Sequence, residues 1–427
     1  MAAAARRKIT FLHLSRAFLA IFLLALPFSL RVVFATPFTY MAGYFSEPMS
    51  FAFYLSDILL LISLLFYLLS QLAGELRPKI TRPYTLWLLI GLIFLVLEIN
   101  CLTAIYPPLA AFWLLRTLAG ILLVFLLGEK LLPLVSICKW LVAGGIIQSI
   151  IAIGQFIWQS SLGLKILGEN PLSTSMTNIA KIPFRTITLL RAYGTLPHPN
   201  LLAAFLAICL LLGIYLYLRR ELNLFWLFII SLGLLLTFSR AVIFGTLVLL
   251  IIGYFTSGRS GNFKRILYTG LIALVLVAIP LFGSLFLRSK DYAASDRIRS
   301  YQQALEIVEQ KPLLGVGKNN YVLALKQNNY YRLNIWEYQP VHNLELLVLS
   351  ETGLLGLLAF GALLTYLIYC LASQKPSLER TLAIALILLL LWSAQFDHFF
   401  WDLHQGAMVM WLTVGAAGMI GANKFDR

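Results

Sequence analysis

A histidine and an asparagine, His342 and Asn343, lie where a polar segment passes into a long apolar run, and Gly353 and Gly356 follow within that run. A neutral imidazole, with an ordinary pKa of ~6.5, can take a proton from a hydroxyl group at neutral pH. The first turn of a helix leaves backbone N–H groups unpaired, and these groups and the helix dipole favour a bound anion. The junction therefore combines a candidate base, His342, with a candidate anion site, and Asn343 is the expected N-cap.

A second junction has the same residue types, because His198 and Asn200 flank Pro199 just before another apolar run. Proline suits the first helical turn, where its missing N–H would be unpaired in any case. A histidine at such a position is more often a hydrogen-bonded cap than a base, and we favour that role for His198. His198 and Asn200 are therefore expected to support the site rather than to carry its chemistry.

Helices that cross a membrane are the elements expected to position both junctions. The chain is 60% hydrophobic and only 12% charged over 427 residues, too much apolar surface for the interior of a soluble domain. Runs of about twenty apolar residues match a hydrocarbon core of ~30 Å, whereas membrane strands would alternate over ~10 residues. The sequence predicts an all-α polytopic membrane protein with about twelve spans: 14–34, 51–72, 84–105, 107–127, 132–157, 198–218, 222–238, 241–256, 265–287, 344–372, 379–396 and 403–421.

The distribution of basic residues predicts the orientation of these spans. Alternate short connections are rich in lysine and arginine, for example 6–8, 77–82 and 219–220, which places them in the cytoplasm together with both termini. The first span is expected to be retained, since it lacks a small-residue cleavage site. The expected organisation is 1–157 with the first five spans, 158–197 as an outer loop, 198–287 with four spans, 288–343 as a second outer loop and 344–427 with the last three.

Both outer loops are basic, which suggests a partner that carries phosphate. Segment 158–197 has four Lys or Arg residues and one acidic residue, and segment 288–343 has eight and five. Each segment therefore has an excess of three positive charges. A solvated loop with scattered cations explains this charge equally well, but a guanidinium binds phosphate oxygens bidentately. The candidates for phosphate binding are Arg185, Arg191 and Arg297, with Arg240 and Arg299 next. Arg240 is expected at the outer interface, because two short spans enclose it.

Three residues inside the span 344–372 are expected to support the site. Gly353 and Gly356 lie on one helical face, where small residues would let another helix approach closely. Glu351 is expected to pair with an arginine or to accept hydrogen bonds, since a carboxylate at that depth is costly without a partner.

Several functional classes are excluded or disfavoured by the sequence. Nucleotide-binding glycine motifs are absent, so the energy for any reaction must come with the substrate, and no nucleic-acid partner is expected. The four cysteines, Cys101, Cys138, Cys209 and Cys370, have no metal-site or disulfide spacing. The turn 396–404 contains two aspartates and two histidines and could imitate a metal site, but an interfacial aromatic belt is the favoured interpretation, with no metal.

The pattern H-N-x9-G-x-x-G, made by His342, Asn343, Gly353 and Gly356, resembles the signature of the O-antigen ligase family. Further stretches agree in type and order, and the likeness covers about residues 185–360: Arg191-x-x-Gly194 with His198-Pro199-Asn200, Ser239-Arg240, and Arg297-x-x-x-Tyr301-x-x-Ala304 leading to Pro312-x-x-Gly315-x-Gly317. The resemblance implies a membrane glycosyltransferase of the GT-C type that needs no metal or other cofactor.

The resemblance also implies a reaction. The donor would be a glycan on undecaprenyl pyrophosphate in a bacterial plasma membrane, and the site would lie on the outer face. His342 would take the proton of an acceptor hydroxyl group, on a lipid core, a glycan or a protein, and the arginines would hold the departing diphosphate while the anomeric centre inverts. A polymerase of the same superfamily, or a glycan exporter without catalysis, remains an alternative.

Overall fold

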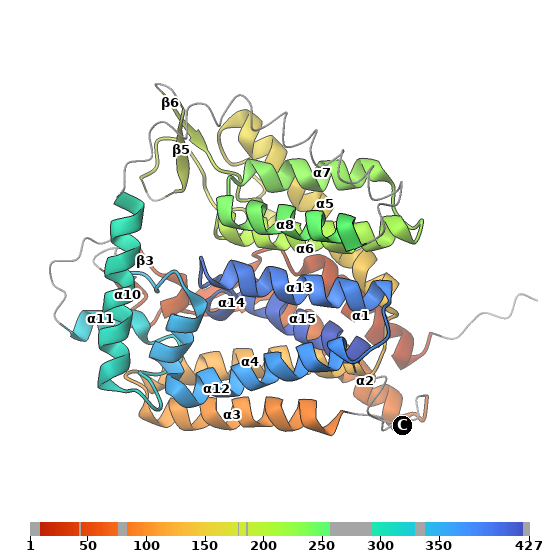
Figure 1. Ribbon diagram of the computed structural model, residues 1–427, viewed down its shortest axis with the longest axis horizontal. Coiled ribbons are helices and arrows are strands. Elements are labelled where there is room, and N and C mark those ends of the chain that lie inside the picture. Colours follow the sequence, from red (N-terminus) through yellow and green to blue (C-terminus); the bar gives the residue numbers. More distant parts are fainter. Residues whose placement is uncertain are drawn as a thin grey trace, which may run out of the picture.

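The protein is described here by a computed structural model, which describes residues 9–41, 44–75, 83–177, 179–184, 187–256, 292–328 and 338–421. Most of these residues are helical, and the helices are stacked roughly parallel in layers (Figure 1). The helices that occupy expected spans are α1 (Phe11–Ala25), α2 (Leu55–Leu72), α3 (Tyr84–Thr103), α4 (Pro107–Gly128), α5 (Leu134–Trp158), α6 (Pro199–Leu218), α7 (Leu224–Leu236), α8 (Arg240–Thr256), α12 (Leu344–Ala372), α13 (Leu378–Ala394) and α15 (His404–Gly421).

Six of the described helices, α2 to α6 and α12, are long and apolar enough to cross a membrane. Three shorter apolar helices, α1, α7 and α8, accompany them. The chain is therefore a polytopic membrane protein, as predicted. The number of twelve spans stays a prediction, and one of them, 265–287, lies outside the described residues.

Helix α6 is the most buried of the six long helices. It is apolar on all sides, which is typical of a helix enclosed by others. Helices α5, α7, α13 and α8 pack around it. The N-terminus of α6, with His198 and Asn200, is therefore fixed inside the protein.

The all-α prediction is wrong in detail, because the described residues also form three two-stranded antiparallel sheets. The pairs are β1 (Arg31–Phe34) with β4 (Phe51–Tyr54), β2 (Tyr40–Met41) with β3 (Tyr44–Phe45), and β5 (Lys181–Phe184) with β6 (Ile187–Leu190). The expected spans 14–34 and 51–72 each include a strand, so α1 ends earlier and α2 begins later than predicted. Short β-branched and aromatic runs have the same hydrophobicity in a strand as in a helix, which explains the error.

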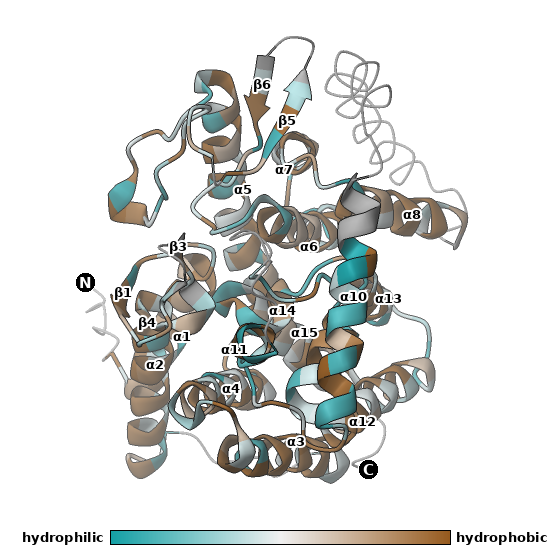
Figure 2. Ribbon diagram, turned by 90° about the vertical axis from the view of Figure 1, so that its left-hand side faces the viewer, coloured by the Kyte–Doolittle hydropathy of each residue, from teal (hydrophilic) through white to brown (hydrophobic). Residues whose placement is uncertain are grey.

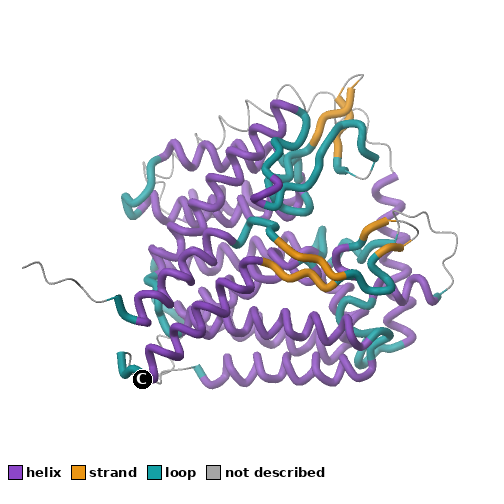
Figure 3. The backbone as a smooth tube through the Cα atoms, turned by 180° about the vertical axis from the view of Figure 1, so that it is seen from behind, coloured by secondary structure: helices purple, strands orange, loops and turns teal. Residues whose placement is uncertain are grey.

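The two expected outer loops contain structure of their own. Segment 158–197 includes β5, β6 and the 3-10 helix η2 (Lys165–Leu167), and segment 288–343 includes α10 (Tyr292–Gln310) and α11 (Tyr321–Gln327). Helix α10 crosses the ends of the apolar helices and is more hydrophilic than they are (Figure 2). The strands also lie toward one end of the helices (Figure 3). Polar and irregular structure is thus gathered at one end of the described helices.

Helix α12 is broken at Gly353, which has a φ of +65° and a ψ of −170°. The segment 312–317 fills the break: Val316 N donates to Ser350 O (3.0 Å), and Leu354 N donates to Pro312 O (2.8 Å). A Cβ atom on residue 353 would collide with the backbone of this segment. The prediction that Gly353 lets another helix approach is therefore wrong, since an irregular loop approaches instead and pairs with the opened backbone.

Candidate functional site

The start of α6 places two side chains in different roles. His198 precedes the helix, and its Nδ1 accepts a hydrogen bond from Asn200 N (3.2 Å), which confirms that it is a cap. The side chain of Asn200 forms a bridge: Oδ1 accepts from Arg191 Nη2 (2.6 Å), and Nδ2 donates to Asp397 Oδ2 (2.7 Å). Arg191 also donates from Nε to Thr237 O (2.7 Å) at the end of α7. The guanidinium is thus fixed between two helices.

Two glutamines of α5 hold the segment that precedes α6. Gln155 accepts hydrogen bonds from Tyr193 N (3.0 Å) and Gly194 N (2.8 Å) and donates to Gly194 O (2.7 Å). Gln148 pairs in the same way with the backbone N and the hydroxyl group of Thr195. Gly194 has a φ of +59°, and a Cβ there would collide with Gln148. Sequence analysis missed both glutamines, although polar residues inside an apolar helix are a signal of such a role.

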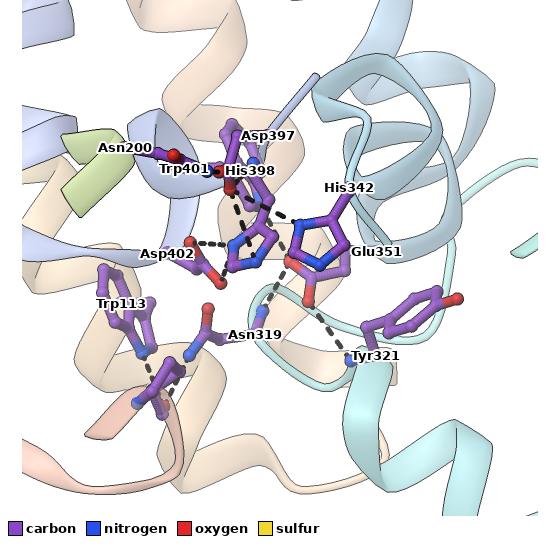
Figure 4. Close-up of polar contacts among 11 residues, drawn as sticks. Trp113, Asn200, Asn319, Tyr321, His342, Glu351, Asp397, His398, Trp401 and Asp402 are labelled. Carbon is purple, nitrogen blue, oxygen red and sulfur yellow. Dashed lines mark hydrogen bonds and ion pairs between the residues drawn. The ribbon is translucent and has the colours of Figure 1, made fainter. Parts of the chain in front are cut away.

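At the start of α12 the roles of histidine and asparagine are reversed. Asn343 is the N-cap, and its side chain accepts from Leu346 N (2.9 Å), as predicted. His342 lies just outside the helix, with Nδ1 3.6 Å from Asp397 Oδ1 (Figure 4). Its side chain is 30% exposed, against 7% for Asp397 and 13% for His398. His342 is therefore the member of this group that a substrate reaches most easily.

Asp397 connects the two helix starts. It follows α13 and is buried, with His342 and His398 near one carboxylate oxygen and Asn200 on the other. Burial alone would raise the pKa of Asp397, but the nearby imidazole groups of His342, His398 and His198 outweigh burial and hold that pKa well below its ordinary value. Asp397 is thus an ionised carboxylate at the centre of the cluster.

His398 lies between Asp397 and a second buried carboxylate, Asp402 at the end of the short helix α14 (Phe399–Asp402). Its Nε2 is 3.7 Å from Asp397, and its Nδ1 is 2.8 Å from Asp402. Burial lowers the pKa of His398, but Asp402 and Asp397 outweigh burial and raise it to about 9. The ring of His398 lies 5.2 Å from the ring of His342, so a cation adjoins the candidate base.

The interpretation of 396–404 as an interfacial aromatic belt is wrong. Phe399, Phe400 and Trp401 are each 1% exposed, whereas residues of such a belt would face lipid. The turn is instead an internal support of the site, and Asp397, His398 and Asp402 are functional candidates that were not selected from the sequence. His404 has a different partner, with its Nε2 2.8 Å from Ser56 Oγ. Their density in one short turn was the signal.

Glu351 lies below this cluster in α12 and accepts three hydrogen bonds, as predicted for a buried carboxylate. The donors are Asn319 N (2.7 Å), Tyr321 N (3.2 Å) and Trp401 Nε1 (2.7 Å) (Figure 4). Its cationic neighbour is Lys318 rather than an arginine. Gly356, one turn beyond the break, packs against Thr352.

The five candidate arginines are not equivalent. Arg191 is part of the cluster; burial lowers its pKa to about 10, partly offset by Tyr193 and Asp397, so it remains charged at neutral pH. Arg240 begins α8, is exposed and is near enough to Arg191 to lower that pKa further. Two candidates, Arg297 and Arg299, are exposed on α10, and Arg185 lies outside the described residues.

A set of three residues could hold a metal ion. The nearest ligand atoms of His342, Asp397 and His398 all lie within 4.8 Å of one another. A neutral imidazole and a carboxylate are suitable ligands for divalent ions, and Asp402, 2.8 Å from His398 Nδ1, would orient that ring. The protonated state that the two carboxylates favour for His398 opposes this use, because a metal ligand must be deprotonated.

Comparison with known families identifies one match. Residues 224–361 match the family model described as O-antigen ligase, which confirms the resemblance over that part of the chain. The matched range contains His342, Asn343, Gly353, Gly356 and Arg240 but ends before Asp397. No curated protein matched the chain. The family implies glycosyl transfer of the O-antigen ligase and polymerase type.

Proposed function

We propose that the protein is an O-antigen ligase-like glycosyltransferase of a bacterial plasma membrane. It transfers a glycan from undecaprenyl pyrophosphate to a hydroxyl group of an acceptor, with inversion and without a metal ion. Both termini are cytoplasmic, and the cluster around Asp397 faces outward at the ends of the helices. The family match to residues 224–361 supports the reaction class, and the geometry of the cluster supports the assignment of roles.

The observation that carries the proposal is the connection of a candidate base to a candidate phosphate-binding cation through one buried carboxylate. Asp397 adjoins His342 on one side and reaches Arg191 through Asn200 on the other. These residues come from the start of α6 and the segment before it, from the segment before α12 and from the turn after α13. Three parts of the chain far apart in sequence thus meet at one centre.

In the transfer step, His342 accepts the proton of the acceptor hydroxyl group. Its Nδ1 faces Asp397, which leaves Nε2 to take the proton, and the carboxylate stabilises the imidazolium that forms. The acceptor oxygen forms a bond to the anomeric carbon from the face opposite the diphosphate. The bond between the anomeric carbon and the phosphate oxygen breaks, and its electron pair leaves with the diphosphate.

Arg191 and Arg240 stabilise this leaving group. Arg191 is held by Asn200 and Thr237, so its planar fork is oriented before the donor binds. Arg240 lies at an exposed helix start close by, where a lipid-linked diphosphate has access from the membrane surface. Two adjacent cations repel each other, and a diphosphate between them relieves that repulsion.

The test is an assay of purified wild-type protein and His342→Ala with a purified lipid-linked glycan and a candidate acceptor, each with and without a chelator. A general base contributes about 10²- to 10⁴-fold, so we expect His342→Ala to lose at least a hundredfold in kcat. Undiminished transfer by the variant would exclude His342 as the base. Loss of wild-type activity in chelator would instead favour a metal ion on His342, Asp397 and His398.

The nature of the product separates the alternatives that share this site. A ligase adds one completed chain to the acceptor, whereas a polymerase gives a ladder of chain lengths on gels. An exporter would leave the glycan chemically unchanged. Mass spectrometry of the glycolipids and glycoproteins that disappear on deletion of the gene would identify the acceptor.

A further inference from the structure

Lys318 is a buried cation that the proposed transfer step does not use. Its side chain is 5% exposed, and its Nζ lies 3.3 Å from the centre of the Trp401 ring. An ammonium group over an indole face is attracted by the ring, more strongly when water is excluded. Lysine is almost never fully buried without such compensation, so this position requires a reason.

Hydrogen bonds that involve two helices, α3 and α12, hold the backbone of Lys318 in place. Asn100 of α3 accepts from Lys318 N (2.8 Å), and its amide group donates to Glu351 O (2.8 Å) in α12. The flanking residues Gly317 (φ +108°) and Asn319 (φ +62°) are both in left-handed conformations. The side chain of Lys318 is therefore directed inward by a turn that is itself anchored to the break in α12.

Two carboxylates interact with this ammonium group. Burial lowers the pKa of Lys318, and the negative charges of Glu351 and Asp402 oppose that effect. Asp402 also pairs with His398, so Lys318, Glu351, Asp402 and His398 form one connected set of titratable groups among the described residues. Removal of one cation from such a set leaves a buried charge without compensation, which is strongly unfavourable.

We propose that Lys318 is a positioning residue: its ammonium group packs on Trp401 and so holds α14, in which Asp402, the next residue, orients His398 beside Asp397 and His342. Lys318 thus acts through Trp401 and α14, in addition to the influence of its charge on Glu351. The competing explanation is that Lys318 only compensates the charge of Glu351. The positioning of His398 by Lys318 does not depend on the proposed function. Only the expected effect of Lys318 on glycan transfer rests on it.

The test compares two variants that both lack the charge of Glu351, namely Glu351→Gln and the double variant Lys318→Met/Glu351→Gln. Methionine is close to lysine in length and volume and removes only the charged end. If Lys318 only compensates Glu351, the double variant should equal or exceed Glu351→Gln. If Lys318 positions α14 through Trp401, the double variant should have a kcat at least tenfold lower, with a KM for the donor within twofold.

A spectroscopic measurement reports on the site without any assay of transfer. The chain contains only five histidines, so protein labelled with ¹⁵N in histidine gives few ring signals, which single substitutions assign. We expect the ring signals of His398 to differ between the two variants and those of the exposed His13 to coincide. Lys326→Met is the matched control: it removes an exposed lysine whose Nζ lies 5.9 Å from the Phe38 ring, and it should change neither kcat nor the His398 signals.

The outcomes separate this inference from the proposed function. Coincident His398 signals and equal kcat values in the two variants would overturn the positioning role. A double variant that fails to fold where Glu351→Gln folds would also count against it, because Lys318 would then serve stability alone. If the wild-type protein transfers no glycan, the proposed function fails, and the histidine signals still decide the role of Lys318.

Discussion

The starts of α6 and α12 contain the same two residue types and use them in opposite ways. At α6 the histidine caps the helix, and Asn200 reaches across to Arg191 and Asp397. At α12 the asparagine caps the helix, and His342 faces Asp397. A residue that caps a helix has its side chain occupied by the backbone, so its neighbour is the one available for chemistry.

This difference shows that the function of a histidine near a helix start depends on its position relative to the N-cap. His198 is at the N-cap, and its Nδ1 is occupied by a backbone N–H. His342 is one residue earlier, and its ring nitrogens lie outside the helix. Asp397 contacts both helix starts, and substitutions can separate their contributions.

The largest effect is expected for Asp397→Asn, because this carboxylate serves both helix starts. The amide has nearly the same shape but no charge, so it can neither stabilise an imidazolium at His342 nor balance His398. We expect kcat to fall by about a hundredfold or more. Glu379→Gln is the matched control, since Glu379 pairs with Arg219 at the far end of α13; equal activity of the two variants would contradict the role of Asp397.

A smaller effect is expected for Asn200→Ala, which removes the bridge between Arg191 and Asp397. A hydrogen bond to a charged group contributes about 1.5 to 3 kcal/mol, so kcat/KM should fall by roughly tenfold to a hundredfold. Because Arg191 is assigned to the diphosphate, most of the loss should appear in the KM for the donor. A loss confined to kcat would show that Asn200 acts on the base instead.

A third substitution, Asn343→Ala, should affect stability more than catalysis. Loss of an N-cap costs about 1 kcal/mol, and His342 keeps its neighbour Asp397. We expect a lower melting temperature in detergent and a reduction in kcat of less than fivefold. Asn343→Ser keeps a capping oxygen and should restore most of the melting temperature. A larger loss of activity than in Asn200→Ala would mean that Asn343 has a role beyond capping.

The smallest effect is expected for His198→Asn, which keeps a capping acceptor and removes a titrating group. Burial lowers the pKa of His198 to about 4, despite the opposing charge of Asp397, whereas an unfolded histidine titrates near ~6.5. As the pH falls from 7 to 5, the unfolded chain takes up a proton that the folded chain does not, so folding becomes less favourable. The melting temperature of the wild-type protein should therefore fall more over this interval than that of His198→Asn, and equal slopes would contradict the assignment.

Much of the fold could be predicted because its signals are local. A run of about twenty apolar residues predicts a membrane helix wherever it occurs, and proline or asparagine just before it predicts the start. Thus the start of α6 at Pro199 and the cap of α12 at Asn343 were both predicted. The strands β1 and β4 were not, because short apolar runs do not distinguish strand from helix.

The candidate site was predictable only in part. His342, Arg191 and Asn200 could be selected from spacing and residue type, and the structure places them around one carboxylate. The carboxylate itself, Asp397, and its neighbour His398 were assigned to a membrane interface. Their role depends on the burial of the turn, and the residues of the turn alone do not show whether it is buried or faces lipid.

The sequence by itself determined the class of the protein, the starts of α6 and α12 and the residue types available for chemistry, because these follow from composition and from neighbours along the chain. The tertiary structure decided which of those residues meet. The contact of Asp397 with His342, the insertion of 312–317 into α12 and the burial of Lys318 against Trp401 all join segments that are distant in sequence. Such contacts arise from the packing of whole helices, and no local pattern specifies them.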